Sequence, residues 1–337
     1  MATKHMNMKR ITHRIKEELG STVEVAKHVS LSDAIATLMG KIDIQIMTRN
    51  GHVQKEWMIK HLQKKHSAMN KYFAKNFEAF AKNYDVDKVV VPSVDERYQG
   101  CVWVCWWQGI EKAPEIVKMC VESIRRNIGE HKLIVITEDN ISEYIEFPDW
   151  VIQKYKKGII SKTHLSDILR LELMARYGGL WLDSTFYCAA SIEYLFDLPV
   201  WSVKRPNYRY TSVACGYFAN YSFGCSNDYR KVYAIIRDYL FEYWQKYDYM
   251  IDYLFLDYLI VLARNSHKYV DDVFTAIPDN NPMCDELLKV LNEPYDSAVW
   301  NRLKQDTQLF KLTWKAGTQQ EVNGLKTFYG RLKDNEL

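Results

Sequence analysis

The sequence predicts an α/β protein with a parallel or mostly parallel sheet flanked by helices, preceded by a helical extension. After Pro92, short apolar runs rich in β-formers alternate with helical segments, which is the order that places parallel strands in one sheet. One of these helices stops at a glycine pair and is followed at once by an apolar strand. Residues before Pro92 instead form a lysine-rich helical pattern. We therefore divide the chain into an extension, residues 1–92, and an α/β domain, residues 93–337.

The extension is basic and amphipathic. Residues 1–84 contain 15 Lys and Arg against 7 Asp and Glu, whereas the remaining residues contain 30 against 35. Residues 53–83 place apolar and aromatic side chains among many lysines. Such a helix can pack on its own α/β domain, or it can contact an anionic membrane or a partner. The pattern leaves both alternatives open.

The elements expected after Pro92 follow from hydrophobic periodicity and from the residues that begin or end helices. A β-rich run is followed by an amphipathic helix that opens near Pro114 and by a second strand. The next helix ends at Gly178, where a glycine provides a C-cap. Ser226 is a suitable cap for a later long helix. The expected strands are residues 101–107, 132–137, 179–183, 200–203, 213–219 and 309–314, and the expected helices are 113–127, 163–177, 226–247 and 252–263.

Composition restricts the compartment and the partners. The 337 residues are 47% hydrophobic, enough for a sizeable core, and contain seven cysteines with no signal peptide ahead of them. An odd number of thiols without a leader favours a reducing compartment, so we expect a cytoplasmic protein whose basic helices can rest on the inner face of the membrane. No apolar run approaches the roughly 20 residues that span a bilayer. The basic helices lack a stacking-rich recognition motif, and we expect no nucleic-acid partner.

Three charged residues are expected to converge on one point. Asp167 and Arg170 are three residues apart in a helix, so they project from one face. Asp183 ends the following strand, the place where open α/β sheets bind ligands. One acid–base pair plus a carboxylate at a strand end suits a phosphorylated sugar. Asp183 is also the first candidate ligand for a hard divalent cation. Such a cation commonly takes its oxygen ligands from both protein carboxylates and substrate phosphates.

The run Ser166-Asp167-Ile168-x-Arg170 through Tyr177-Gly178-Gly179-x-Trp181-x-Asp183 resembles the donor-binding signature of capsular polysaccharide synthesis glycosyltransferases. These are relatives of the D-x-D sugar-binding-region glycosyltransferases and of the clostridial glucosylating toxins. The resemblance covers residues 100–320 and none of the first hundred. It implies a glycosyltransferase A-type fold, a Rossmann-like mixed sheet flanked by helices.

The same resemblance assigns roles to single residues. Asp167 and Arg170 would bind the donor sugar, with Ser166 and Gly179 beside them in the donor-binding signature. Asp183 would contact ribose and a Mn²⁺ or Mg²⁺ ion as a catalytic and metal-binding residue.

The sequence departs from that motif at one position. Thr185 stands where the second metal-binding aspartate is expected, and its hydroxyl carries no charge. Either Asp183 acts with donor phosphates and water, or a basic residue replaces the cation. The segment 310–315 resembles the closing segment of the family, in which side chains reach the diphosphate. Lys311 and Lys315 are the candidates for that contact.

Two further patches resemble parts of the family. Trp106, Trp107 and Gln108 follow the first strand, where a tryptophan would stack on the nucleobase and the glutamine would reach base or phosphate. Residues 251–258 resemble an acceptor-side helix. Asp252 and Asp257 are its candidate catalytic carboxylates, since a positioned carboxylate can orient an acceptor hydroxyl or transfer its proton.

By this resemblance the chain transfers a sugar from a nucleoside-diphosphate sugar, most simply a UDP-sugar, to a growing surface polysaccharide or a lipid-linked oligosaccharide. The transfer would retain the anomeric configuration. Two alternatives stay open. One is a sugar-phosphate transferase, which leaves phosphate in the new linkage. The other, prompted by Thr185, is a non-catalytic donor-binding or scaffold subunit of a capsule assembly complex.

Overall fold

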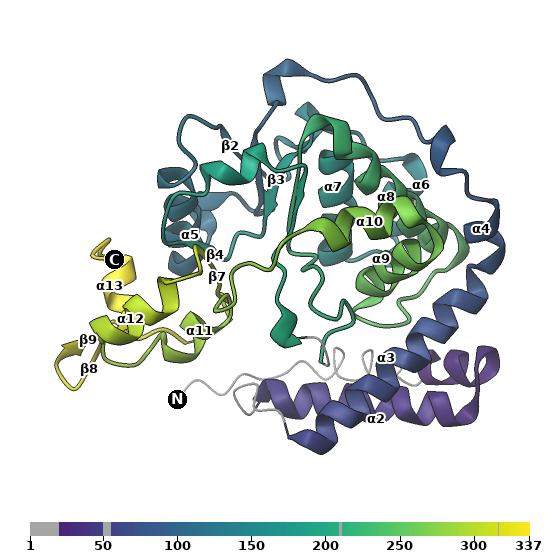
Figure 1. Cartoon of the computed structure of the whole chain (residues 1–337), viewed down its shortest axis with the longest axis horizontal. Helices are drawn as coiled ribbons and strands as arrows, with labels where there is room; N and C mark the ends of the chain where they lie inside the picture. Colours follow the sequence, from purple (N-terminus) through teal and green to yellow (C-terminus); the bar gives the residue numbers. More distant parts are fainter. Residues whose placement is uncertain (1–19, 50–54, 209–210, 316) are drawn as a thin grey trace.

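The computed structural model describes residues 20–49, 55–208, 211–315 and 317–337. Within these residues the central feature is a five-stranded sheet in the order β2-β1-β3-β6-β5 (Figure 1). The first three of these strands run parallel to one another, and β6 runs antiparallel to both of its neighbours. The strands are β1 (Val102–Cys105), β2 (Leu133–Ile136), β3 (Gly179–Leu182), β5 (Val200–Trp201) and β6 (Ser222–Cys225).

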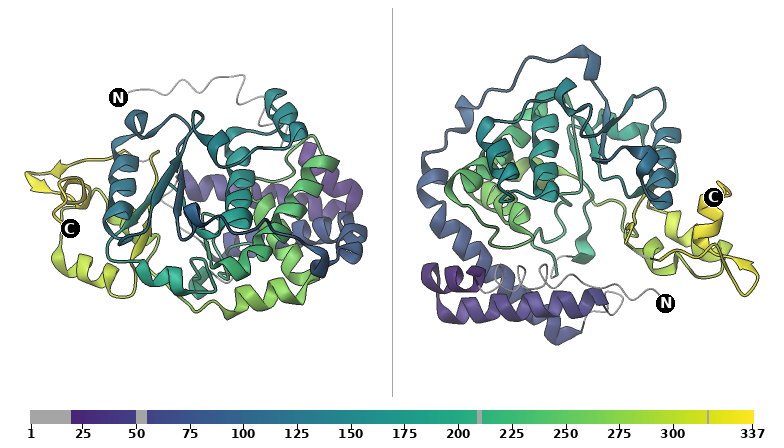
Figure 2. Two further views of the ribbon diagram at one scale, coloured as in Figure 1. Left: turned by 90° about the horizontal axis from the view of Figure 1, so that it is seen from above. Right: turned by 180° about the vertical axis from the view of Figure 1, so that it is seen from behind.

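Helices cover both faces of the sheet because its strands are apolar on both sides. Trp103 and Trp181 point into a core shared with α7 and α8, whereas Leu180 and Leu182 point into a second core shared with α5. Figure 2 shows the strands between α5 on one side and α7 on the other. The helices of this part are α5 (Glu115–Arg126), α6 (Asp149–Lys156), α7 (Lys162–Tyr177), α8 (Arg230–Lys246), α9 (Phe255–Ser266) and α10 (Lys268–Ala276).

The corner between α7 and β3 depends on two glycines. Ser161 caps the start of α7, and Gly178 ends it with a φ of 65°, in the left-handed region. Gly179 follows with a φ of 78°, and a Cβ at this position would lie 2.2 Å from the carbonyl oxygen of Cys101. Only glycine fits such a conformation and such a close approach. The corner therefore directs β3 so that Asp183 leaves the sheet at its C-terminal end.

A second, two-stranded sheet brings a distant segment next to Asp183. It pairs β4 (Phe186–Cys188) antiparallel with β7 (Leu309–Lys311), with Phe186 opposite Lys311. The remaining C-terminal elements extend to one end of the molecule, opposite α8 to α10 (Figure 1). They are α11 (Glu286–Val290), α12 (Ser297–Lys304), β8 (Glu321–Val322), β9 (Leu325–Lys326) and α13 (Phe328–Lys333).

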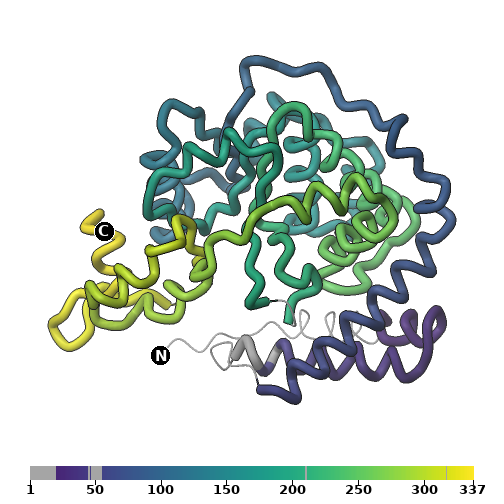
Figure 3. The backbone as a smooth tube through the Cα atoms, viewed as in Figure 1, coloured from purple at the N-terminus to yellow at the C-terminus, as the bar shows by residue number. Residues whose placement is uncertain are grey.

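The described part of the extension packs on the α/β domain. It contains α2 (Leu31–Arg49), α3 (Glu56–Asn76) and α4 (Glu78–Asn83), and α3 lies against α9. The ring of Phe73 stacks on that of Tyr258 in α9, with centroids 5.6 Å apart. From α4 the chain runs along the outside of the molecule to β1 (Figure 3). No helix among the described residues is long and apolar enough to cross a membrane.

Two expected elements differ from the structure. Residues 213–219 form turns and one isolated bridge instead of a strand, because Cys215 and Gly216 take φ values of 48° and 77°. The strand in this region, β6, begins only at Ser222. Helix α9 begins at Phe255 and not at Asp252, since the Asp252 carboxylate accepts the backbone N–H of Leu254 (2.9 Å) in the preceding turn.

Candidate active site

A pocket of about 450 Å³ opens at the end of β3. Its volume is within the usual range of about 300–1,000 Å³ for small-molecule sites. Segments that are far apart in the sequence meet there: α7, the end of β3, the turn before β6, the start of α9 and β7. Their charged contributions to the lining are Asp167, Arg170, Asp183, Asp257 and Lys311.

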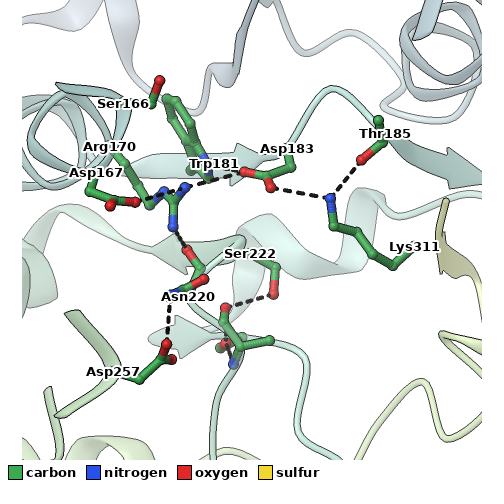
Figure 4. Close-up of polar contacts among 12 residues, drawn as sticks. Ser166, Asp167, Arg170, Trp181, Asp183, Thr185, Asn220, Ser222, Asp257 and Lys311 are labelled. Carbon is green, nitrogen blue, oxygen red and sulfur yellow. Dashed lines mark hydrogen bonds and ion pairs between the residues drawn. The ribbon is translucent and has the colours of Figure 1, made fainter. Parts of the chain in front are cut away.

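Asp183 stands at the centre of this lining. Its backbone N–H donates to the carbonyl of Tyr221 (3.1 Å), which anchors the end of β3 against the start of β6. Its carboxylate Oδ1 accepts from Trp181 Nε1 (3.1 Å) and Arg170 Nη2 (3.3 Å), and Oδ2 accepts from Lys311 Nζ (3.1 Å) (Figure 4). Burial acts to raise the pKa of Asp183, but the charges of Lys311 and Arg170 outweigh it and the pKa is lowered. Asp183 is therefore a fixed anion.

Asp167 and Arg170 form the expected pair on one face of α7. Arg170 Nη2 lies 3.4 Å from Asp167 Oδ1, and its Nη1 donates to the carbonyl of Asn220. The guanidinium also lies over the Trp181 ring, 5.2 Å from the centroid. These contacts hold Arg170 in place between the two carboxylates. Burial raises the pKa of Asp167 to about 6, although Arg170 acts to lower it.

Lys311 links Asp183 to Thr185. Its ammonium lies 3.1 Å from Asp183 Oδ2 and 2.6 Å from Thr185 Oγ1 (Figure 4). Thr185 is buried, with 6% of its surface exposed, whereas the Lys311 side chain is 21% exposed. The two motif positions after β3 thus hold a lysine ammonium between them.

Asp257 faces the same pocket from the start of α9. Its Oδ2 accepts from Asn220 Nδ2 (2.9 Å). Burial, with a further contribution from the charge of Asp167, raises the pKa of Asp257 to about 7. Tyr253 stands beside it at the rim, 70% exposed, so an aromatic face is open to a ligand. The pocket therefore combines a fixed anion with two carboxyl groups that can hold a proton near neutral pH.

Several of the expected site residues lie outside this cluster, and Asp252, Gly179 and Lys315 are the most distant from their expected roles. Asp252 is 4% exposed and forms an ion pair with Lys65 of α3 (2.9 Å), so its side chain points to the extension, whereas the next residue, Tyr253, lines the pocket. Gly179 is at the start of β3, at the opposite end from Asp183, and its role there is conformational. Lys315 is exposed beyond β7, and its ammonium lies over the neighbouring Trp314 ring, 5.6 Å from the centroid.

The residues expected at the nucleobase lie at the end of β1. Trp107 Nε1 donates to Ser166 Oγ (2.9 Å), which joins this segment to α7 one turn before Arg170. The Trp106 ring meets the Trp314 ring edge-on at 6.1 Å, and Gln108 is exposed in a turn. These residues are not part of the pocket lining. They flank it, since β1 and β3 are parallel neighbours whose C-terminal ends share one edge of the sheet.

The sequence analysis missed the turn that closes the pocket, and it interpreted the segment around Arg205 as a solvated loop, whereas Arg205 is buried and lines the pocket. Asn220 and Tyr221 precede β6 without any motif, and only the pairing of β6 with β3 brings them to Asp183. Arg205 is buried against Asp285 and lies 4.0 Å from the centroid of the Tyr208 ring. A close contact between the backbones of Arg205 and Gly216 folds this loop back on itself. Its arginine and tyrosines are the signal that could have suggested it.

Comparison with protein families assigns most of the chain to a known family. The model of the capsular polysaccharide synthesis protein family matches residues 49–332, well over half of the chain. The chain belongs to this family. Membership in the capsular polysaccharide synthesis family indicates a role in capsule biosynthesis. A comparison with curated proteins found no match.

The family match corrects one expectation about the extension. Similarity was expected over residues 100–320 only, but the match begins at residue 49 and so includes α3 and α4. The packing explains this extent, because Tyr72 and Phe73 of α3 belong to the same core as α8 and α9. A segment that completes the core is part of the family's structure.

Proposed function

We propose that this protein is a glycosyltransferase that uses a nucleoside-diphosphate sugar, most simply a UDP-sugar. The acceptor is a growing capsular polysaccharide or a lipid-linked oligosaccharide, and the anomeric configuration is retained. A glycosyltransferase A-type fold accommodates this function, and the sheet with one reversed strand beside β3 supports that fold.

The observation that carries the proposal is the convergence of Asp167, Arg170, Asp183 and Lys311 on one pocket. Carboxylates accept hydrogen bonds from sugar hydroxyls, and the two cations can bind phosphate oxygens. Arg170 is held by both carboxylates and by the Asn220 carbonyl, so the anions are already oriented before a donor binds. Such preorganisation is the main source of catalysis in transfer reactions with little covalent chemistry by the protein.

In the reaction, the bond between the anomeric carbon and the β-phosphate oxygen breaks, and a bond to the acceptor oxygen forms on the same face. The acceptor proton moves to the departing diphosphate. Asp183 and Arg170 fix the donor, whereas Asp257 at the opposite wall holds the acceptor hydroxyl. Because Asp257 has a pKa of about 7, it can accept or donate that hydrogen bond in the physiological range.

A panel of nucleotide sugars tests the proposal. The full-length protein is screened by thermal shift with EDTA and with MnCl₂, since a ligand that binds the native state raises its melting temperature. Candidate donors are then incubated with capsule fragments, and the products are analysed by mass and by anomeric configuration. A panel without any shift under either condition contradicts the proposal. Phosphate retained in the linkage identifies a sugar-phosphate transferase, and binding without turnover identifies a non-catalytic subunit.

We further propose that the extension rests on the anionic inner face of the cell membrane, where a lipid-linked acceptor is located. Helix α2 has an exposed apolar stripe at helical spacing: Leu31, Ile35, Met39, Ile42 and Ile46. The excess of lysine and arginine in residues 1–84 complements an anionic surface.

A further inference from the structure

We propose that Lys311 is the built-in cation of this site, and that it replaces the divalent metal ion as the group that neutralises the departing diphosphate. This inference rests on the proposed function and deepens it. It concerns a catalytic residue on β7 that is 128 residues away from Asp183 in the sequence.

The residues present do not fit a divalent cation. A hard cation such as Mg²⁺ needs about six oxygen ligands in near-octahedral geometry. Here Asp183 Oδ1 accepts from Trp181 and Arg170, and Oδ2 accepts from Lys311. Within the described residues, no group of three His, Cys, Asp or Glu side chains is placed to hold a metal ion. A metal at Asp183 would have to displace one ammonium and remain beside a guanidinium, both of which repel it.

The charges in the motif and the lysine match one another. A D-x-D motif with a divalent cation combines two negative charges with two positive ones. In this chain Thr185 removes one negative charge, and Lys311 provides one positive charge instead of two. The ammonium lies between the two motif positions, 3.1 Å from Asp183 Oδ2 and 2.6 Å from Thr185 Oγ1. Thr185 and Lys311 therefore act as a pair that preserves the neutrality of the site.

The backbone around Lys311 holds it in this position. Its N–H donates to the carbonyl of Cys284 (2.7 Å), and the next residue, Leu312, donates to the carbonyl of Thr185 (2.8 Å). The ammonium lies 5.6 Å from the centroid of the Phe186 ring and 5.2 Å from that of Tyr221. The backbone hydrogen bonds and the two rings hold Lys311 in place, so its charge does not have to reorient during the reaction.

A diphosphate has further partners next to Lys311. The Tyr221 hydroxyl is buried and makes no hydrogen bond within the described residues, although it borders the pocket. The guanidinium of Arg205 also lies near this ring, 5.9 Å from the centroid, and Arg205 is part of the pocket lining. A buried hydroxyl without a partner carries a free-energy cost that a phosphate oxygen would remove. The lysine, this hydroxyl and Arg205 together form a subsite for the diphosphate.

Binding of nucleotides without their sugar tests the inference. UDP, GDP, ADP and CDP, each with its monophosphate, are titrated calorimetrically into the full-length protein in EDTA and in MnCl₂. We expect at least one diphosphate to bind in EDTA about tenfold to a hundredfold more tightly than its monophosphate, with no gain from Mn²⁺. Lys311→Met should remove this preference and Lys311→Arg should keep part of it. Lys268→Met, an equal change on the exposed face of α10, should have no effect.

The outcomes separate the inference from the function. Diphosphate binding that requires Mn²⁺, or a full preference kept in Lys311→Met, overturns the role of Lys311 but leaves the glycosyltransferase proposal intact. Absence of diphosphate binding in both conditions overturns both. The melting temperature of each variant shows whether it is folded. If Lys311→Met does not fold, Lys311→Arg is compared with the native protein instead, because it keeps the positive charge. The inference also predicts that transfer activity persists after EDTA treatment.

Discussion

Asp183 is the residue on which the whole site depends. It is held by Trp181, Arg170 and Lys311, and the positive charges keep its pKa low despite burial. Removing its charge would leave the buried Arg170 and the partly buried Lys311 without their shared partner. A bound donor would then lose its contact with Asp183, and Arg170 and Lys311 would lose their fixed positions around it.

We therefore expect Asp183→Asn to lower turnover by about 10² to 10³-fold, the usual cost of losing one preorganised electrostatic contact. Asp272→Asn, on the exposed surface of α10, is the matched control and should keep full turnover. Donor consumption is measured beside circular dichroism to separate activity from folding. Full turnover in folded Asp183→Asn would show that the site is elsewhere.

Asp257 makes stability depend on pH in a defined direction. Its pKa is about 7 in the folded protein, against about 4 for an unfolded carboxyl group. A raised folded pKa means that the unfolded state loses its proton first, so stability is greatest at low pH and declines as the pH rises to about 7. Above that value the full cost of the buried charge is present.

Asp257→Asn should remove this dependence. Between pH 5.5 and pH 8, the stability of the variant relative to the native protein should rise by about 2 kcal/mol, since each pKa unit corresponds to about 1.4 kcal/mol. Urea unfolding at the two pH values measures the change, and the comparison cancels the titration of groups that both proteins share. An unchanged difference would mean that the carboxyl group ionises normally in the fold.

At the scale of elements, a buried ion pair joins the extension to the α/β domain. Lys65 of α3 lies 2.9 Å from Asp252 Oδ2 and 3.0 Å from the Tyr258 hydroxyl, and its side chain is 1% exposed. The pKa of Asp252 is lowered by Lys65 and Lys41 even though burial acts to raise it. Loss of one partner leaves an uncompensated charge in the core.

Lys65→Met should therefore destabilise the protein by about 3–5 kcal/mol. On the same helix, Lys71 forms an exposed pair with Asp33, and Lys71→Met should change stability by at most about 1 kcal/mol. Thermal and chemical unfolding of both variants gives the comparison. Equal effects would show that α3 is held by apolar packing alone.

At the scale of the whole molecule, the exposed stripe of α2 is the surface that we propose rests on lipid. If this helix rests on lipid, Ile35→Glu/Ile42→Glu should abolish co-sedimentation with anionic vesicles, because the charges would enter the apolar region. Zwitterionic vesicles should bind the native protein more weakly. Lys268→Met again serves as a control. Binding that survives both glutamates would exclude α2 as the contact surface.

Much of the α/β domain follows from local sequence signals. The helix and strand that carry Asp167, Arg170 and Asp183 were predicted within one residue, since apolar periodicity and a glycine pair determine both elements. Residues 213–219 were wrongly expected to form a strand. Their apolar composition resembles one, but contacts with Arg205 and the left-handed residues Cys215 and Gly216 fold them into turns.

The sequence by itself determined the arrangement of the candidate donor-binding motif, because residues three apart on a helix and a carboxylate at a strand end are local geometry. Only the tertiary structure decided which charges meet. It assigned Asp252 to a buried ion pair with Lys65 and placed Lys311 between Asp183 and Thr185. Electrostatic interaction depends on distance in space, and the pairing of β4 with β7 sets that distance for residues that are far apart in the chain.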